Sequence, residues 1–185
     1  MEKININVDS ALKDALEEGQ AVKVGGYFTV EHVRNGEVID KEVSKNIVVD
    51  QGLNYILDAA LSNGTAITTL YLGIFKNNYT PIAGDTASTF AGAGVANEII
   101  TEIDESTRPQ WVEAGVASKT ITNSASAAVF TANTTVAAYG AFLISNNTLG
   151  GTSGTLISAS KFSAVKNLAN TDTLNVTYTL TIADA

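Results

Sequence analysis

Apolar and polar residues alternate most strictly between residues 173 and 182. Every second residue there is apolar, and threonine or asparagine occupies the positions between them. This period of two predicts a strand with one face on a core and the other toward solvent. Six further segments have strand-like composition and are separated by turn-forming residues. They span residues 68–76, 97–104, 110–117, 126–132, 136–145 and 155–163.

A hairpin is predicted upstream, where residues 27–33 and 37–43 flank Arg34-Asn35-Gly36. Asn-Gly supplies the two positive-φ positions of a type I′ turn. Residues 51–61 have helical spacing instead, with an apolar face of Leu53, Ile56, Leu57, Ala60 and Leu61. We expect Asp50 to cap this helix and Asn63-Gly64 to end it. A shorter helix is expected over Asp9–Glu18, with Leu12 and Leu16 in its apolar stripe.

These elements favour an all-β fold: an antiparallel sandwich of jelly-roll or immunoglobulin-like type, with an N-terminal helix and a β-hairpin. We divide the chain into an N-terminal arm over residues 1–24 and a sandwich domain over residues 25–185. The long connection over residues 81–95 is expected to be functional or mobile.

Composition narrows the possible functions. The net charge of −8 argues against a nucleic-acid backbone or an anionic membrane as the main partner. No apolar run reaches 18 residues, so no membrane-spanning helix is expected. The chain has no cysteine, which excludes disulfides, thiolate zinc sites and cysteine nucleophiles. Residues 120–160 carry no charge, which suits either a subunit interface or a sandwich core with uncharged loops.

Catalytic chemistry has few candidates. His32 is the only histidine, and we interpret it as a structural strand residue, with a general-base role as the alternative. Strand alternation places its neighbour Glu31 on the opposite face, where Glu31 cannot orient the ring. The acidic residues Glu98, Glu102, Asp104 and Glu105 are interpreted as the solvated face of an edge strand.

The alternatives for these acidic residues are a Ca²⁺ site or a hydrolase carboxylate pair, such as Glu102 with Glu113. We expect a protein that is not an enzyme and that holds no cofactor or metal. Arg108 and Trp111 belong to the residue types enriched at binding hot spots, although Trp111 also suits a core.

Several blocks of sequence stand out together. In chain order they are Phe28–His32, Lys45–Asp58, Tyr71–Phe75, Pro81 with Asp85-Thr86, Arg108-Pro109-Gln110-Trp111, Gly140–Leu143 and Gly150–Leu156. These blocks resemble a structural protein family of tailed bacteriophages. Together they cover about residues 27–182 and leave the N-terminal helix outside.

The resemblance implies a virion component, most readily a decoration (cement) protein that stabilises the head shell. Its expected partners are the major capsid protein and copies of itself, as a homotrimer. Its expected location is the capsid surface, after synthesis in the host bacterial cytoplasm. In that setting Leu12 and Leu16 of the arm would dock on the capsid. The alternative is a tail or fibre-associated protein that binds a host-surface glycan through the 81–95 loop and Tyr79, Phe90 and Trp111.

Overall fold

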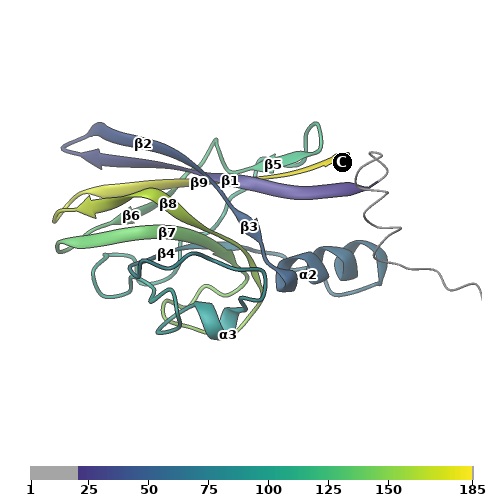
Figure 1. Cartoon of the computed structure of the whole chain (residues 1–185). Helices are drawn as coiled ribbons and strands as arrows, with labels where there is room; N and C mark the ends of the chain where they lie inside the picture. The colour runs from purple at the N-terminus through teal and green to yellow at the C-terminus, as the bar shows by residue number, and fades with distance from the viewer. Residues whose placement is uncertain (1–20, 185) are drawn as a thin grey trace, which may run out of the picture.

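The chain folds as two antiparallel β-sheets packed face to face (Figure 1). The structure, a computed structural model, describes residues 21–184; the expected helix with Leu12 and Leu16 lies outside them. Sheet A has the order β2 (Glu37–Lys45), β1 (Val22–Arg34), β9 (Thr173–Asp184) and β5 (Thr120–Thr122), and β6 (Ala128–Thr131) also pairs with β9. Sheet B has the order β3 (Ile47–Val48), β8 (Leu156–Leu168), β7 (Val136–Ile144) and β4 (Tyr71–Phe75). The predicted all-β antiparallel sandwich is therefore confirmed.

Sheet A is built around the predicted hairpin and the predicted alternating strand. Asn35 and Gly36 both have positive φ, as the Asn-Gly turn requires. β1 pairs with β9 from Val22 opposite Asp184 to Val33 opposite Thr173. Because β1 begins at Val22, the sheet includes the last residues that the sequence assigned to the arm.

The core lies between the two sheets. It takes the inward residues of β9 (Leu174, Val176 and Tyr178), as the alternation predicted. The rings of Phe28 and Tyr178 pack at a centroid distance of 4.7 Å. From sheet B the core takes residues of β4 and β7, including Leu72, Ala141 and Leu143. Much of the uncharged stretch over residues 120–160 thus belongs to the sandwich itself.

A second apolar cluster covers the outer face of sheet B. The segment between β4 and residue 97, with the short helix α3 (Ala87–Phe90), packs on that face (Figure 1). Phe90 lies at its centre, 5.5 Å from the ring centroids of both Phe75 and Phe142. Gly73 leaves room for this packing, because a Cβ there would collide with the Phe142 ring. The long connection, expected to be functional or mobile, is therefore anchored on sheet B through Ala87, Phe90 and Ala91.

Helix α2 (Asp50–Leu61) matches the predicted helix and ends as expected, with Asn63 at positive φ. Its N-cap is Val49, which corrects Asp50. The chain passes directly from sheet B into the helix, since the Val49 N–H bonds to Ile157 O and the Asp50 N–H to Ala83 O.

Two predicted strands are absent from the described residues. The segments 97–104 and 110–117 make isolated bridges only, such as Phe75 opposite Glu98 and Tyr71 opposite Gln110. Their first residues lie against the edge of β4, whereas Ile103 bridges to Ala132 and Ala117 to Thr120. Short stretches outside the predictions, β3 and β5, complete the sheets.

Candidate interaction surfaces

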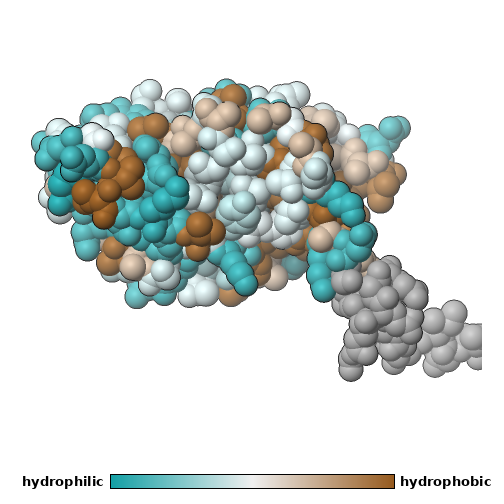
Figure 2. Space-filling view, turned by 90° about the horizontal axis from the view of Figure 1, so that it is seen from above, coloured by the Kyte–Doolittle hydropathy of each residue, from teal (hydrophilic) through white to brown (hydrophobic). Residues whose placement is uncertain are grey.

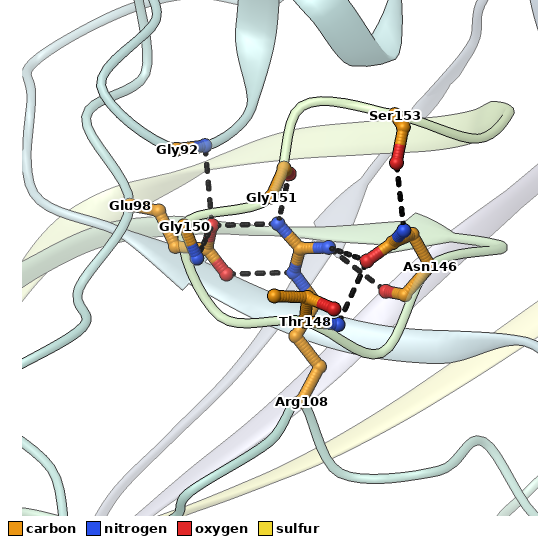
Figure 3. A network of polar contacts seen from close by, with 8 residues as sticks. All are labelled: Gly92, Glu98, Arg108, Asn146, Thr148, Gly150, Gly151 and Ser153. Carbon is orange, nitrogen blue, oxygen red and sulfur yellow. Dashed lines mark hydrogen bonds and ion pairs between the residues drawn. The ribbon is translucent and has the colours of Figure 1, made fainter.

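Arg108 and Glu98 form a fully buried ion pair (Figure 3). Arg108 Nε donates to Glu98 Oε1 and Nη2 donates to Glu98 Oε2, each at 2.7 Å. Nη1 donates to the Asn146 carbonyl at 2.8 Å, and Nη2 also donates to the Gly151 carbonyl at 2.7 Å. A weaker contact from Nη1 to Asn146 Oδ1, at 3.4 Å, uses the remaining donor.

The same ion pair fastens three irregular segments together. Glu98 Oε2 accepts from the backbone N–H groups of Gly92 and Gly150, each at 3.1 Å. The network thus links the segment that follows α3, the segment around Arg108 and the loop between β7 and β8 (Figure 3). Since both side chains have no exposed surface, Arg108 is a structural residue and offers a partner no direct contact. Glu98 is likewise not part of a solvated face, which corrects that interpretation.

The other acidic residues between positions 98 and 105 do not form a common site. Glu102 pairs with Lys76, and Glu105 accepts from the Thr131 N–H at 3.0 Å. Burial raises the pKa of Glu102, but the Lys76 ion pair and the Ile100 N–H hydrogen bond together outweigh burial, so the pKa is lowered. Asp104 is the exposed member. Within residues 21–184, no group of three or more histidine or acidic side chains could hold a metal ion.

His32 is buried and structural, as interpreted from the sequence. Its Nε2 lies 2.7 Å from Asp172 Oδ2. Arg34 bonds to the same carboxylate, with Nη2 at 2.7 Å from Oδ2. The Arg34 hydrogen bonds hold the pKa of Asp172 well below its usual range. The sequence did not indicate Asp172, which is 140 positions from His32.

A buried lysine closes the edge of the sandwich between β2 and β8. The Lys166 side chain is 3% exposed, and its Nζ lies 2.7 Å from Asp40 Oδ2 and 2.6 Å from Glu42 Oε2. Glu42 also accepts from the Ser163 N–H. The inward carboxylates of β2 thus bind cations and amide groups of β8 and hold the two sheets together here.

The aromatic residues proposed for glycan recognition do not share a face. Phe90 is fully buried in the sheet B cover, and Trp111 is 7% exposed in the central core. The Trp111 indole N–H donates to the Tyr178 carbonyl at 3.2 Å. Tyr79 stays partly exposed beside Phe90, at a centroid distance of 6.0 Å, and donates to Asp85 at 3.0 Å. The face built from Tyr79, Phe90 and Trp111 is therefore not formed, and Trp111 is a core residue.

Helix α2 carries apolar residues that the described chain leaves uncovered. Its N-terminal part packs on β8, where a Cβ on Gly52 would collide with the Ile157 backbone. Further along, Leu57 is 57% exposed and Leu61 is 81% exposed. The helix lies at one end of the molecule, beyond the ends of β4 and β7 and on the same side as the start of β1 (Figure 1). The predicted apolar face exists, but only its N-terminal part, Leu53 and Ile56, is partly covered.

Comparison with known proteins does not assign the chain to a family: no protein-family model matches it, and no curated protein matches it. Among the described residues, neither helix has the length and apolar character that crossing a membrane requires.

Proposed function

We propose that this protein is a non-enzymatic structural component of a phage virion that decorates the capsid and stabilises the head shell. The sequence blocks described above support the link to phage particles. For the fold, we propose a jelly-roll or immunoglobulin-like type, supported by the two facing antiparallel sheets. The functional partners in this proposal are the major capsid protein and two further copies of this chain.

The observation that carries the proposal is the C-terminal part of the apolar face of α2, Leu57 and Leu61, which residues 21–184 leave exposed. An amphipathic helix on a soluble domain normally turns its apolar face inward. Here Leu57 and Leu61 are 57% and 81% exposed, and burying their exposed surface against a partner would contribute about 1–2 kcal/mol each. Repeated across many copies on a capsid lattice, such contacts would hold the protein on the shell without a covalent bond or a catalysed reaction. A structural role accounts for this helix better than an enzymatic one does.

The alternative, a tail or fibre-associated protein that binds a host-surface glycan, has less support. Its recognition face depended on Phe90 and Trp111, which are buried. A hydrolase has less support again. Glu102 is paired with Lys76, while Glu113 lines a separate depression beside Trp111.

The decisive experiment is the copy number of this protein in purified particles, measured by quantitative mass spectrometry against the major capsid protein. A ratio near one is expected for a protein that covers the shell. A ratio of a few copies per particle would move the protein to the tail, and absence from particles would refute both locations. Light scattering of the purified protein is expected to give the mass of a trimer.

A pair of variants tests the α2 contact. Leu57→Glu with Leu61→Glu is expected to abolish binding to undecorated capsids while the free energy of unfolding changes by less than about 0.5 kcal/mol per site, because both residues are exposed. Val38→Glu is the matched control, since Val38 is 54% exposed in the hairpin. Normal decoration by the α2 variant would contradict the proposed contact.

A further inference from the structure

The outer face of sheet A contains a shallow groove of about 260 Å³. Its floor comes from two neighbouring strands in register: Tyr27, Thr29 and Glu31 of β1 lie opposite Thr179, Thr177 and Asn175 of β9. Lys41 of β2 lies at one side. Ser124 and Ala127, from the turn between β5 and β6, line the other side. We call these nine residues the sheet A groove.

This face differs in character from the rest of the molecule. Figure 2 looks down on sheet A and shows a broad pale area between strongly hydrophilic regions. The outward positions of β9 between residues 173 and 181 are threonine, apart from Asn175, and threonine is only weakly hydrophilic. The one charged pair in the groove is internally neutralised, with Lys41 Nζ 2.8 Å from Glu31 Oε1. The groove is therefore polar but without net charge.

Most hydrogen-bonding side chains of the groove have no hydrogen-bond partner within residues 21–184. Thr179 bonds to Thr122 at 2.8 Å. The side chains of Thr29, Ser124, Asn175 and Thr177 make no hydrogen bond to any part of residues 21–184. Hydroxyl and amide groups can donate and accept, so this set suits a ligand that also does both. Tyr27, 41% exposed, adds an aromatic ring at one end.

We propose that the sheet A groove binds a neutral saccharide. A sugar ring presents several hydroxyl groups that donate and accept, and its C–H face packs on an aromatic ring. Glu31 can accept from sugar hydroxyls while Lys41 keeps its charge balanced. An anionic ligand is disfavoured because the chain carries a net charge of −8 and the groove cation is already paired. The site uses other residues than the glycan face expected from the sequence, and it does not depend on the proposed capsid role.

The test is a glycan array that includes neutral hexose and N-acetylhexosamine oligosaccharides, probed with the full-length protein. The best neutral glycan is then titrated calorimetrically against variants. Thr177→Val removes a hydroxyl without changing shape, and Asn175→Ala removes the amide. Each is expected to weaken binding at least tenfold. Tyr27→Ala is expected to weaken binding similarly, whereas Tyr27→Phe keeps the ring and retains most of the affinity.

Thr173→Ala is the matched control, because Thr173 lies on β9 outside the groove and is expected to change affinity less than twofold. The proposal is overturned if no neutral glycan binds, if only charged glycans bind, or if binding survives the groove variants. Reduced decoration of capsids by Tyr27→Ala, without glycan binding, would make the groove a protein contact and would also overturn it. The copy number in particles stays a separate measurement, so either proposal can fail alone.

Discussion

Removing Arg108 is expected to destabilise the protein more than any surface substitution. Arg108→Met leaves the Glu98 carboxylate buried with no cation, since both side chains have no exposed surface. Breaking a buried pair in this way costs about 3–5 kcal/mol. The carbonyls of Asn146 and Gly151 lose their donors as well. For a domain of this size, each kcal/mol lowers the midpoint of thermal unfolding by about 2–4 °C, so a fall of roughly 6–20 °C is expected.

The assay is urea unfolding followed by the fluorescence of Trp111, the one tryptophan of the chain, which lies in the core. Lys119→Met is the matched control: it removes an ion pair with Asp184 whose side chains are 61% and 79% exposed, so the stability is expected to change little. The double variant Glu98→Met with Arg108→Met is expected to recover only part of the loss, because the Gly92 and Gly150 N–H groups then lack an acceptor. A loss below about 1 kcal/mol for Arg108→Met would refute the reasoning.

Two further predictions concern packing and pH. Gly73→Ala is expected to cost about 1–3 kcal/mol in urea unfolding because its Cβ would meet the Phe142 ring, whereas Gly84→Ala, with open space around it, should be close to neutral. Burial raises the pKa of Glu42, but hydrogen bonds, led by that from Lys166, outweigh burial and lower the pKa to about 2. Its stabilising contribution is therefore complete above about pH 4.5 and is lost as the pH falls toward 2. Unfolding curves between pH 5 and pH 2 should show this loss, and Glu42→Gln should flatten it; an equally steep fall in that variant would contradict the assignment.

The sequence predicted the fold where local patterns decide the structure. The alternation of β9, the Asn-Gly turn and the helical spacing of α2 each act within a few residues, and the structure has all three. The prediction of strands over residues 97–104 and 110–117 was wrong because pairing in a sheet depends on distant partners. Ile99, Ile103 and Trp111 reach the core from irregular chain instead, whereas Val112 and Val116 are exposed.

The charged contacts were predicted least well. Glu98 and Arg108 are 10 positions apart, on segments with no regular structure, so no periodicity connects them. Asp172 meets His32 only because β1 and β9 are paired. The tertiary fold brings these residues together, and a single sequence does not show which distant segments will lie side by side. Arg108 was expected at a binding surface and is buried instead, whereas Trp111 lies in the core, the place that its size also suited.

The place of β9 in sheet A has a consequence for biosynthesis. β9 lies between β1 and the short strands β5 and β6, so the middle of the sheet is translated after all of its neighbours. Sheet B can pair as soon as β8 has left the ribosome, while β1, already paired with β2, keeps its other edge unpaired until β9 arrives. Such long-range pairing is slow and leaves the nascent chain prone to aggregation. We therefore expect chains that stop before residue 173 to be captured by chaperones or degraded, which makes completion of the last strand a checkpoint for the production of folded protein.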